Sequence, residues 1–263
     1  MPGGRDTTRR LVIILIVAIV AGLTYVVVTQ KFSTSGRIGL VAAGLIAVVA
    51  LLAIIEPGSS ITGRFLLGYQ RAADTLSEGL GWIAKWLVPT VVVVGFVNVL
   101  LRYIGRWQNR ALTSNRYVEL QWMLFGAIFL LVFPYVLKHG INVRVDFIYQ
   151  RFSRKVQALI DFVGHLLSLV PYCLFAIWVI WDYALTSLYQ RSPRWDTWRV
   201  WDVWEKSGNA GGISPAPIKI LLLLGFVFLL MQTVAELIKL GFVLGEKQQL
   251  AAPEIHDEPL RVE

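Results

Sequence analysis

The chain has 263 residues, of which 56% are hydrophobic and only 16% are charged. Soluble domains are about 45–50% apolar and roughly 25% charged, so this composition excludes a soluble globular domain as well as a disordered or collagen-like chain. One cysteine and three histidines exclude a disulfide framework, a thiol–metal cluster and most zinc sites. We predict an all-α integral membrane protein. Its 25 Lys and Arg against 17 Asp and Glu indicate basic loops at a membrane rather than nucleic-acid binding.

The first 57 residues predict a transmembrane helical hairpin. A spanning helix needs about 20 mostly apolar residues, and the uncharged segments Leu11–Val28 and Ile38–Ile55 approach that length on either side of a short connection. Arginines before the first segment leave a signal peptide as the alternative. We favour an uncleaved anchor, because the apolar run is long for a signal core and no small-residue cleavage site follows it.

Residues 58–82 predict an amphipathic helix that lies in the membrane interface. Ile61, Phe65, Ala72 and Leu76 fall on one helical stripe, and the charged residues lie largely elsewhere. This pattern is typical of interfacial helices. A plain polar connector is the alternative.

Residues 83–244 predict a core of four spanning helices, which brings the expected total to about six. A tryptophan-rich loop at 184–215 separates the last two spans, and a polar, unstructured tail follows at 245–263. Lys and Arg are slightly more numerous on the side of the N-terminus, so we predict that both termini are cytoplasmic. The four expected spans are Ile83–Ile104, Val118–Leu137, Val156–Asp182 and Ala216–Leu240.

Asp161 and His165 are ionisable residues within the fifth predicted span. They are four residues apart and therefore share one face of the helix. Ionisable groups inside spans are costly, which makes this pair a candidate for a proton relay. The alternative is that Asp161 pairs with Lys155 or Arg154 at the start of the helix.

Two further polar pairs lie near the predicted inner surface. Gln232 and Glu236 are four residues apart in the last helix, where they either bond a neighbouring helix or partner subunit or reach the lipid headgroups; both interpretations stay open. Asn142 and Asp146 precede a basic, helically patterned stretch, whose start either of them could cap. That stretch predicts a surface helix with a preference for anionic lipids.

Arg102 and Glu119 lie at one membrane edge, because Arg102 ends the third span and Glu119 begins the fourth. We predict a direct ion pair between them that fixes the packing of the two helices. The alternative is that the arginine extends alone to the headgroups.

The outer loop carries tryptophans at every third position, interleaved with charged residues. These rings either lie at headgroup depth in the membrane interface or form a docking surface for an external protein. The residues are Trp195, Trp198, Trp201 and Trp204.

Catalytic chemistry is not indicated. The sequence contains no phosphate-binding glycine loop, no nucleophile with a base at a suitable spacing, and no set of metal ligands. We predict that the protein is not an enzyme and has no cofactor.

Three patches stand out between Leu80 and Leu240: Asn98–Tyr103 at the end of a span; Glu119, Trp122 and Phe125–Ala127 opening the next span, which runs on to Lys138–Asp146; and Gly211–Ile213 with Pro217–Lys219 before the final helix, which ends Gln232–Leu237. Together they resemble the small membrane subunit of tripartite ATP-independent periplasmic (TRAP) transporters, the DctQ-type small permease. They occur in the order that the family shows. Asn142 stands where the family usually has histidine, and the N-terminal hairpin is additional to the usual four helices. The residues in these patches that we take as structural or interface candidates are Asn98, Arg102, Glu119, Trp122, Asn142, Asp146, Lys219, Gln232 and Glu236.

The resemblance implies a secondary, ion-gradient-driven transporter for uptake of organic acids in the bacterial inner membrane. It implies two partners besides membrane lipids, a large permease subunit and a periplasmic substrate-binding protein. The large subunit of this family carries the substrate and sodium sites, and the small subunit acts mainly as a scaffold. A self-sufficient small transporter or channel is the alternative. Such a protein would need polar residues that meet at mid-membrane, whereas most ionisable residues here lie near helix ends.

Overall fold

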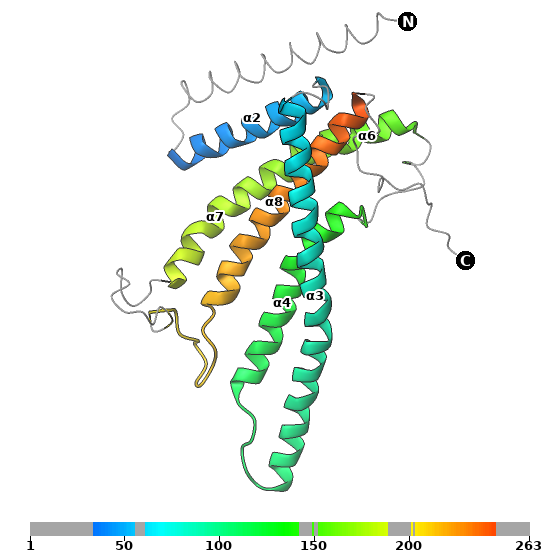
Figure 1. Ribbon diagram of the computed structural model, residues 1–263. Helices are drawn as coiled ribbons and strands as arrows, with labels where there is room; N and C mark the ends of the chain where they lie inside the picture. Colours follow the sequence, from blue (N-terminus) through cyan, green and yellow to red (C-terminus); the bar gives the residue numbers. More distant parts are fainter. Residues whose placement is uncertain are drawn as a thin grey trace, which may run out of the picture. The chain divides into compact units, whose positions relative to one another are not determined.

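The computed structural model describes residues 34–55, 61–141, 149, 152–188, 201 and 203–245. Within these residues every regular element is a helix and no strand occurs (Figure 1), which confirms the predicted all-α fold. The elements are α2 (Thr34–Ile55), α3 (Ile61–Trp107), α4 (Asn115–Lys138), α6 (Arg154–Gly164), the π-turn η1 (His165–Leu169), α7 (Val170–Leu188) and α8 (Ala216–Leu244).

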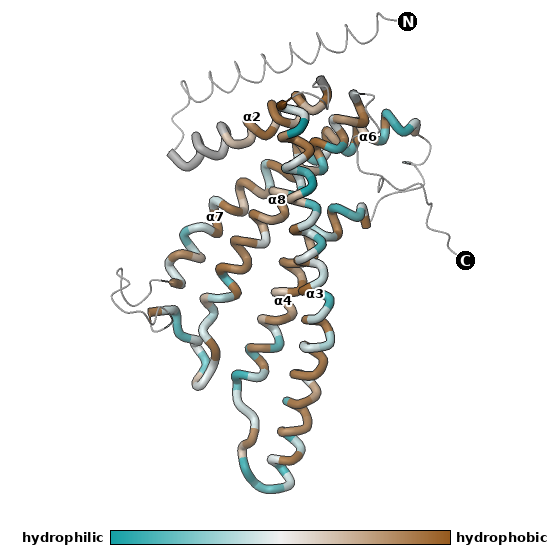
Figure 2. The backbone as a smooth tube through the Cα atoms, in the orientation of Figure 1, coloured by the Kyte–Doolittle hydropathy of each residue, from teal (hydrophilic) through white to brown (hydrophobic). Residues whose placement is uncertain are grey.

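Four helical segments are long and apolar enough to cross a membrane: α3, α4, the continuous α6–η1–α7 segment and α8. A shorter apolar stretch, Ala42–Ile54, lies within α2. Apolar residues follow one another along α7 and α8, whereas the connection between α3 and α4 is hydrophilic (Figure 2). The expected span at 11–28 and the tail at 246–263 lie outside the described residues, so the total of six spans stays a prediction.

Helix α3 differs from the two separate helices that we predicted for this part of the chain. It runs for 47 residues without a break, and Pro89 lies inside it. A change from polar to apolar residues indicates a change of surroundings, but it does not interrupt the backbone hydrogen bonds that continue a helix. At a rise of 1.5 Å per residue, 47 residues measure about 70 Å, more than twice the roughly 30 Å of hydrocarbon in a bilayer. Part of α3 therefore extends beyond the hydrocarbon, although its position in the interface stays a prediction.

The fifth predicted span is helical throughout, but it contains the π-turn at residues 165–169. The backbone N–H of Val170 donates to the carbonyl of His165, five residues earlier. Pro171 follows directly, and a proline ring cannot be accommodated by regular α-helical hydrogen bonding because it has no N–H and clashes with the carbonyl four residues before it. The wider turn makes room for the ring.

The described chain divides into two compact units, the first made of residues up to 76, 136–175 and from 230 onwards, and the second of residues 77–135 and 176–229. In the first unit, buried apolar side chains of α2, α6, α7 and α8 pack together. Gly241 lets α8 approach α2 closely, because a Cβ atom there would lie 2.8 Å from Cβ of Ala53 and 3.0 Å from the carbonyl oxygen of Ala50. Small residues commonly permit such close approach between membrane helices.

Small residues also lie at the helix contacts of the second unit. A Cβ atom on Gly95 of α3 would lie 2.8 Å from Nε2 of Gln121 on α4. A Cβ atom on Gly225 of α8 would lie 3.1 Å from Cβ of Leu130, also on α4. Helix α4 therefore packs against both α3 and α8 within this unit. The loop before α8 is bound to the first turns of α4, as described below.

Candidate functional site

The carboxylate of Glu119 binds the loop that precedes α8. Its Oε1 atom accepts hydrogen bonds from Oγ of Ser207 at 2.6 Å and from Nδ2 of Asn209 at 2.8 Å. The backbone N–H of Ile213 donates to Oε2. Glu119 is only 5% exposed, and a buried carboxylate needs such donors in place of water. The three bonds fix residues 207–213 to the first turns of α4.

Two other residues in the first turn of α4 bind the same loop. Nδ2 of Asn115 donates to the carbonyl of Ala210 at 3.2 Å, and Nε of Arg116 donates to the carbonyl of Gly211 at 2.9 Å. Gly211 has φ of +73°, a left-handed conformation that favours glycine. We call residues 115, 116, 119 and 207–213 the loop anchor.

Gly212 is the second glycine that the loop anchor requires. A Cβ atom at this position would overlap Oγ of Ser207 and both carboxylate oxygens of Glu119. The Gly-Gly pair, which the sequence presents only as part of a patch, thus allows the backbone to approach the carboxylate.

The prediction of an ion pair between Arg102 and Glu119 is wrong, because no such pair occurs among the residues that the structure describes. Glu119 bonds Ser207, Asn209 and the backbone of Ile213, and no ion pair with Arg102 forms. The physical reason is that neutral donors from a distant loop already occupy both oxygens. The prediction considered only the acid nearest to Arg102 along the chain and neglected that competing loop.

A second polar cluster surrounds Glu205 and contains Lys219, one of the predicted site residues. Oε2 of Glu205 accepts from Oγ of Ser187 at 2.7 Å and forms an ion pair with Nζ of Lys219. Nζ of Lys219 also lies 4.0 Å from the ring centroid of Tyr183. The Lys219 ammonium, and after it the Ser187 hydroxyl, hold the pKa of the Glu205 carboxyl below its usual value. These contacts join the end of α7 and the start of α8 to the intervening loop.

Gln232 and Glu236, the third predicted pair, belong to a buried ionic group that we call the buried quartet. Nζ of Lys239 lies 2.7 Å from Oδ1 of Asp74 and 2.8 Å from Oε1 of Glu236. Nε2 of Gln232 donates to the same two oxygens, at 3.0 and 2.8 Å. Gln232 is fully buried and Lys239 is 4% exposed. Charged groups in an apolar helix are stable only when paired in this way.

Sequence reasoning singled out two of the four residues of the buried quartet, Gln232 and Glu236, and left open whether they bond another helix or reach the headgroups. Asp74 lies 165 residues before Lys239, and periodicity cannot join positions so far apart. The available signal was a lysine three residues after Glu236 in an otherwise apolar helix. Such a charge requires a partner.

The Asp161–His165 pair has partners in the first unit. Nδ1 of His165 lies 2.7 Å from the backbone oxygen of Asp161, and the Asp161 carboxylate accepts a hydrogen bond of 2.6 Å from the Tyr149 hydroxyl. Within the described residues, no group of three or more His, Cys, Asp or Glu is placed to hold a metal ion.

The remaining candidates differ in exposure. Trp122 and Trp201 are about half exposed, at 50% and 52%, and the backbone N–H of Trp204 donates to the carbonyl of Trp201. Asn98 is buried, and its Oδ1 atom has no hydrogen-bond partner among the described residues. The candidates outside the described residues are Asn142, Asp146, Trp195 and Trp198.

Comparison with known proteins adds one finding. A family model described as tripartite ATP-independent periplasmic transporters, DctQ component, matches residues 91–241, more than half of the chain. The match begins within α3, ends within α8 and includes the loop anchor. Comparisons with curated proteins and with solved structures give no match.

Proposed function

Because the chain belongs to the DctQ component family of TRAP transporters, we propose that it is the scaffold on which such a transporter assembles. The family is that of the small membrane subunit of a three-part transporter and not of an enzyme. In the proposal, the chain holds the large permease subunit in the membrane and offers its loop side to a periplasmic substrate-binding protein. The match over residues 91–241 is the observation that carries this proposal.

The distribution of apolar side chains supports a scaffold role. Only 6% of the most apolar window of α3 is buried within the chain, so most of this helix face is available to lipid or to another subunit. Helix α4 also carries exposed aromatic side chains, with Phe125, Phe129 and Phe133 in successive ring contacts. Meanwhile the polar residues of the loop anchor bond one another within this chain, which favours a structural role over a transport path.

We further propose an orientation with both termini in the cytoplasm and the loop anchor on the periplasmic side of the inner membrane. The count of Lys and Arg on each side supports it. The substrate expected from the family resemblance is an organic acid, moved by an ion gradient. A reporter that is active only in the cytoplasm, fused at Gly208, should stay silent, and a strong signal there would reverse the orientation.

Co-purification and reconstitution test the scaffold proposal. The tagged chain should bring down the large permease subunit from membranes, and proteoliposomes should take up an organic acid only when the large subunit and the binding protein are also present. A variant that lacks residues 1–57 should still assemble, because the family match begins at residue 91. Uptake by the chain alone would contradict the proposal and favour the self-sufficient transporter.

A further inference from the structure

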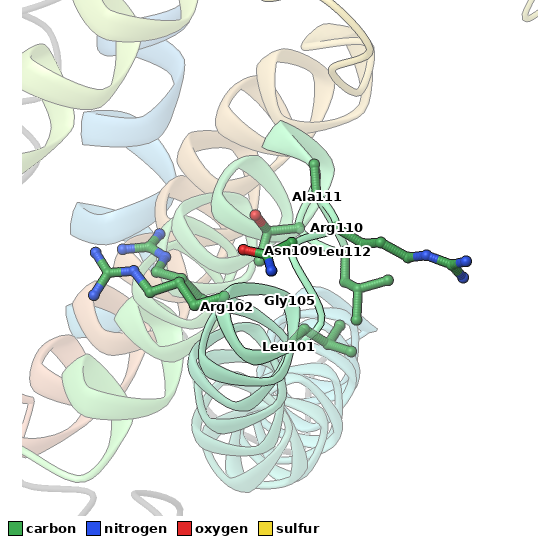
Figure 3. Close-up of a pocket in the computed structure, with 9 residues that line it drawn as sticks. Leu101, Arg102, Gly105, Asn109, Arg110, Ala111 and Leu112 are labelled. Carbon is green, nitrogen blue, oxygen red and sulfur yellow. The ribbon is translucent and has the colours of Figure 1, made fainter.

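A shallow cavity of about 470 Å³, open to the surface, lies at the end of α3 beside the connection to α4 (Figure 3). Three arginines are among the residues that line it, and no acidic residue is. Its apolar lining consists of Leu101, Ala111 and Leu112. The lining residues are Leu101, Arg102, Gly105, Arg106, Asn109, Arg110, Ala111, Leu112 and Thr113.

The backbone around the cavity is a helix cap with a fixed geometry. The N–H of Arg110 donates to the carbonyl of Gly105 at 2.9 Å, and the N–H of Asn109 donates to the carbonyl of Arg106 at 3.3 Å. Asn109 has φ of +53°. This is the Schellman arrangement, in which a left-handed residue after the helix satisfies its last carbonyls. Gly105 permits the close return of the chain, since a Cβ atom there would lie 2.5 Å from the oxygen of Arg110.

The cap leaves the arginine side chains as the charged groups of the cavity. The last helix carbonyls, which carry the negative end of the helix dipole, are bonded within the cap. Arg102, Arg106 and Arg110 are exposed, and none forms an ion pair or a side-chain hydrogen bond with the part of the chain that the structure describes. Arginine side chains that no carboxylate neutralises favour an anion.

The directions of the side chains indicate how an anion is held. Arg102 and Arg106 are four residues apart and share one side of α3, whereas Arg110 extends to the opposite side of the cavity from Arg102 (Figure 3). A guanidinium group presents paired N–H donors that match two oxygens of a phosphate. Two neighbouring guanidinium groups on one helix face therefore suit a phosphate group better than a halide.

We propose that this cavity binds the phosphate of an anionic phospholipid headgroup. The cavity lies at the end of a helix that is long and apolar enough to span the membrane. Tyr103 and Trp107 beside it are 65% and 85% exposed, and aromatic side chains of this kind gather at the depth of the headgroups. The apolar lining residues contact the glycerol part of the lipid, and the arginines contact its phosphate. The inference rests on the membrane location and not on the scaffold role.

Lipid binding to the purified full chain tests the proposal. The chain in detergent is titrated with phosphatidylglycerol, phosphatidylcholine and inorganic phosphate, and bound lipid is counted by native mass spectrometry. Phosphatidylglycerol should bind and phosphatidylcholine should not. The double variant Arg102→Gln/Arg106→Gln should weaken phosphatidylglycerol binding by about tenfold or more, the effect expected for two basic residues near a phosphate.

A matched pair of arginines on the same helix provides the control. Arg64→Gln/Arg71→Gln removes the same charge from exposed positions of α3, and it should leave binding unchanged. Equal loss in both double variants would overturn the site, because it would show a general effect of charge. Equal binding of the two lipids, or displacement of phosphatidylglycerol by inorganic phosphate at equal concentration, would overturn the assignment to a lipid.

The variant Gly105→Ala tests the geometry without changing charge. The added methyl group displaces the returning chain, so phosphatidylglycerol binding should fall while circular dichroism shows unchanged helix content. Unchanged binding in this variant, together with unchanged binding in Arg102→Gln/Arg106→Gln, would place the lipid elsewhere.

Discussion

The loop anchor and the buried quartet both join segments that are far apart in the sequence, but they do so with different chemistry. Around Glu119 a single carboxylate receives hydrogen bonds from a hydroxyl, an amide and a backbone N–H. In the buried quartet, one lysine is shared by two carboxylates. Removing one neutral donor should lower the free energy of unfolding only modestly. Removing the lysine leaves two like charges together in an apolar setting, which should lower it much more. The two regions should therefore respond very differently to single substitutions.

The largest effect is expected for Lys239→Met. This variant leaves Asp74 and Glu236 without their shared cation, and breaking a buried ion pair on one side typically costs about 3–5 kcal/mol. Thermal unfolding of the protein in detergent should show a clearly lower midpoint. Lys85→Met removes an exposed lysine of α3 and should change little.

A triple variant sharpens this expectation. Replacing Asp74, Glu236 and Lys239 by Asn, Gln and Met removes all three charges together, so most of the lost stability should return. If the triple variant is no more stable than Lys239→Met, charge imbalance is not the reason for the loss.

A smaller and local effect is expected for Glu119→Ala. The loss of three hydrogen bonds releases residues 207–213 from α4. Their amides should exchange hydrogen at least about tenfold faster, since about tenfold is the effect of losing a single typical hydrogen bond. Hydrogen exchange followed by mass spectrometry measures this. Exchange in the first unit should stay as it is, and a global increase would show that the anchor supports the whole fold.

The Glu205 cluster adds a dependence on pH. The pKa of Glu205 is lowered in the folded protein, so the stabilisation that it provides is complete above the ordinary carboxyl pKa and is lost as the pH falls through the lowered value. Intrinsic amide exchange slows as the pH falls, so the quantity to compare is the protection factor, the intrinsic rate divided by the observed rate. At residues 203–206 the protection factor should fall on acidification in the wild type. In Glu205→Gln it should already be lower at neutral pH and less sensitive to acid, and an identical pH profile would contradict this assignment.

The smallest effect is expected for Asn115→Ala. Its hydrogen bond to Ala210 is exposed and 3.2 Å long, and water replaces such a bond readily. Exchange in the loop should change by less than about threefold, below the effect of Glu119→Ala. A larger change would mean that the first turn of α4, rather than the carboxylate, holds the loop.

Apolar runs were sufficient to predict the all-α fold and the four helices that are long enough to span a membrane, because length and hydropathy alone set those properties. The family was also predictable, since its patches lie close to helix ends and keep their order, and the match over residues 91–241 confirms it. The continuity of α3 was not predictable from polarity, which reports the surroundings of a helix and not its hydrogen bonds. For this reason, the interfacial helix and the spanning helix that we predicted separately form one continuous helix.

The polar contacts were predictable only within single helices. The spacing of Gln232 and Glu236 placed both on one helix face but left their partners open, and Asp74 and Ser207 came from segments whose position only the tertiary fold decides. The wrong ion pair between Arg102 and Glu119 has the same origin. Proximity along the chain identified two charged groups at one predicted membrane edge. It gave no information on a loop some 90 residues away whose hydrogen-bond donors bind the Glu119 carboxylate.

The length of α3 bears on how deeply this helix lies in a bilayer. Trp82 and Trp86 are 64% and 59% exposed, and at 1.5 Å per residue the helix from Trp86 to Tyr103 measures about 26 Å, close to the thickness of the hydrocarbon. We expect these two aromatic levels, rather than the helix ends, to mark the membrane boundaries on α3. Because α3 is continuous through the level of the tryptophans, a bilayer that thickens or thins can be accommodated by a change in the tilt of the helix.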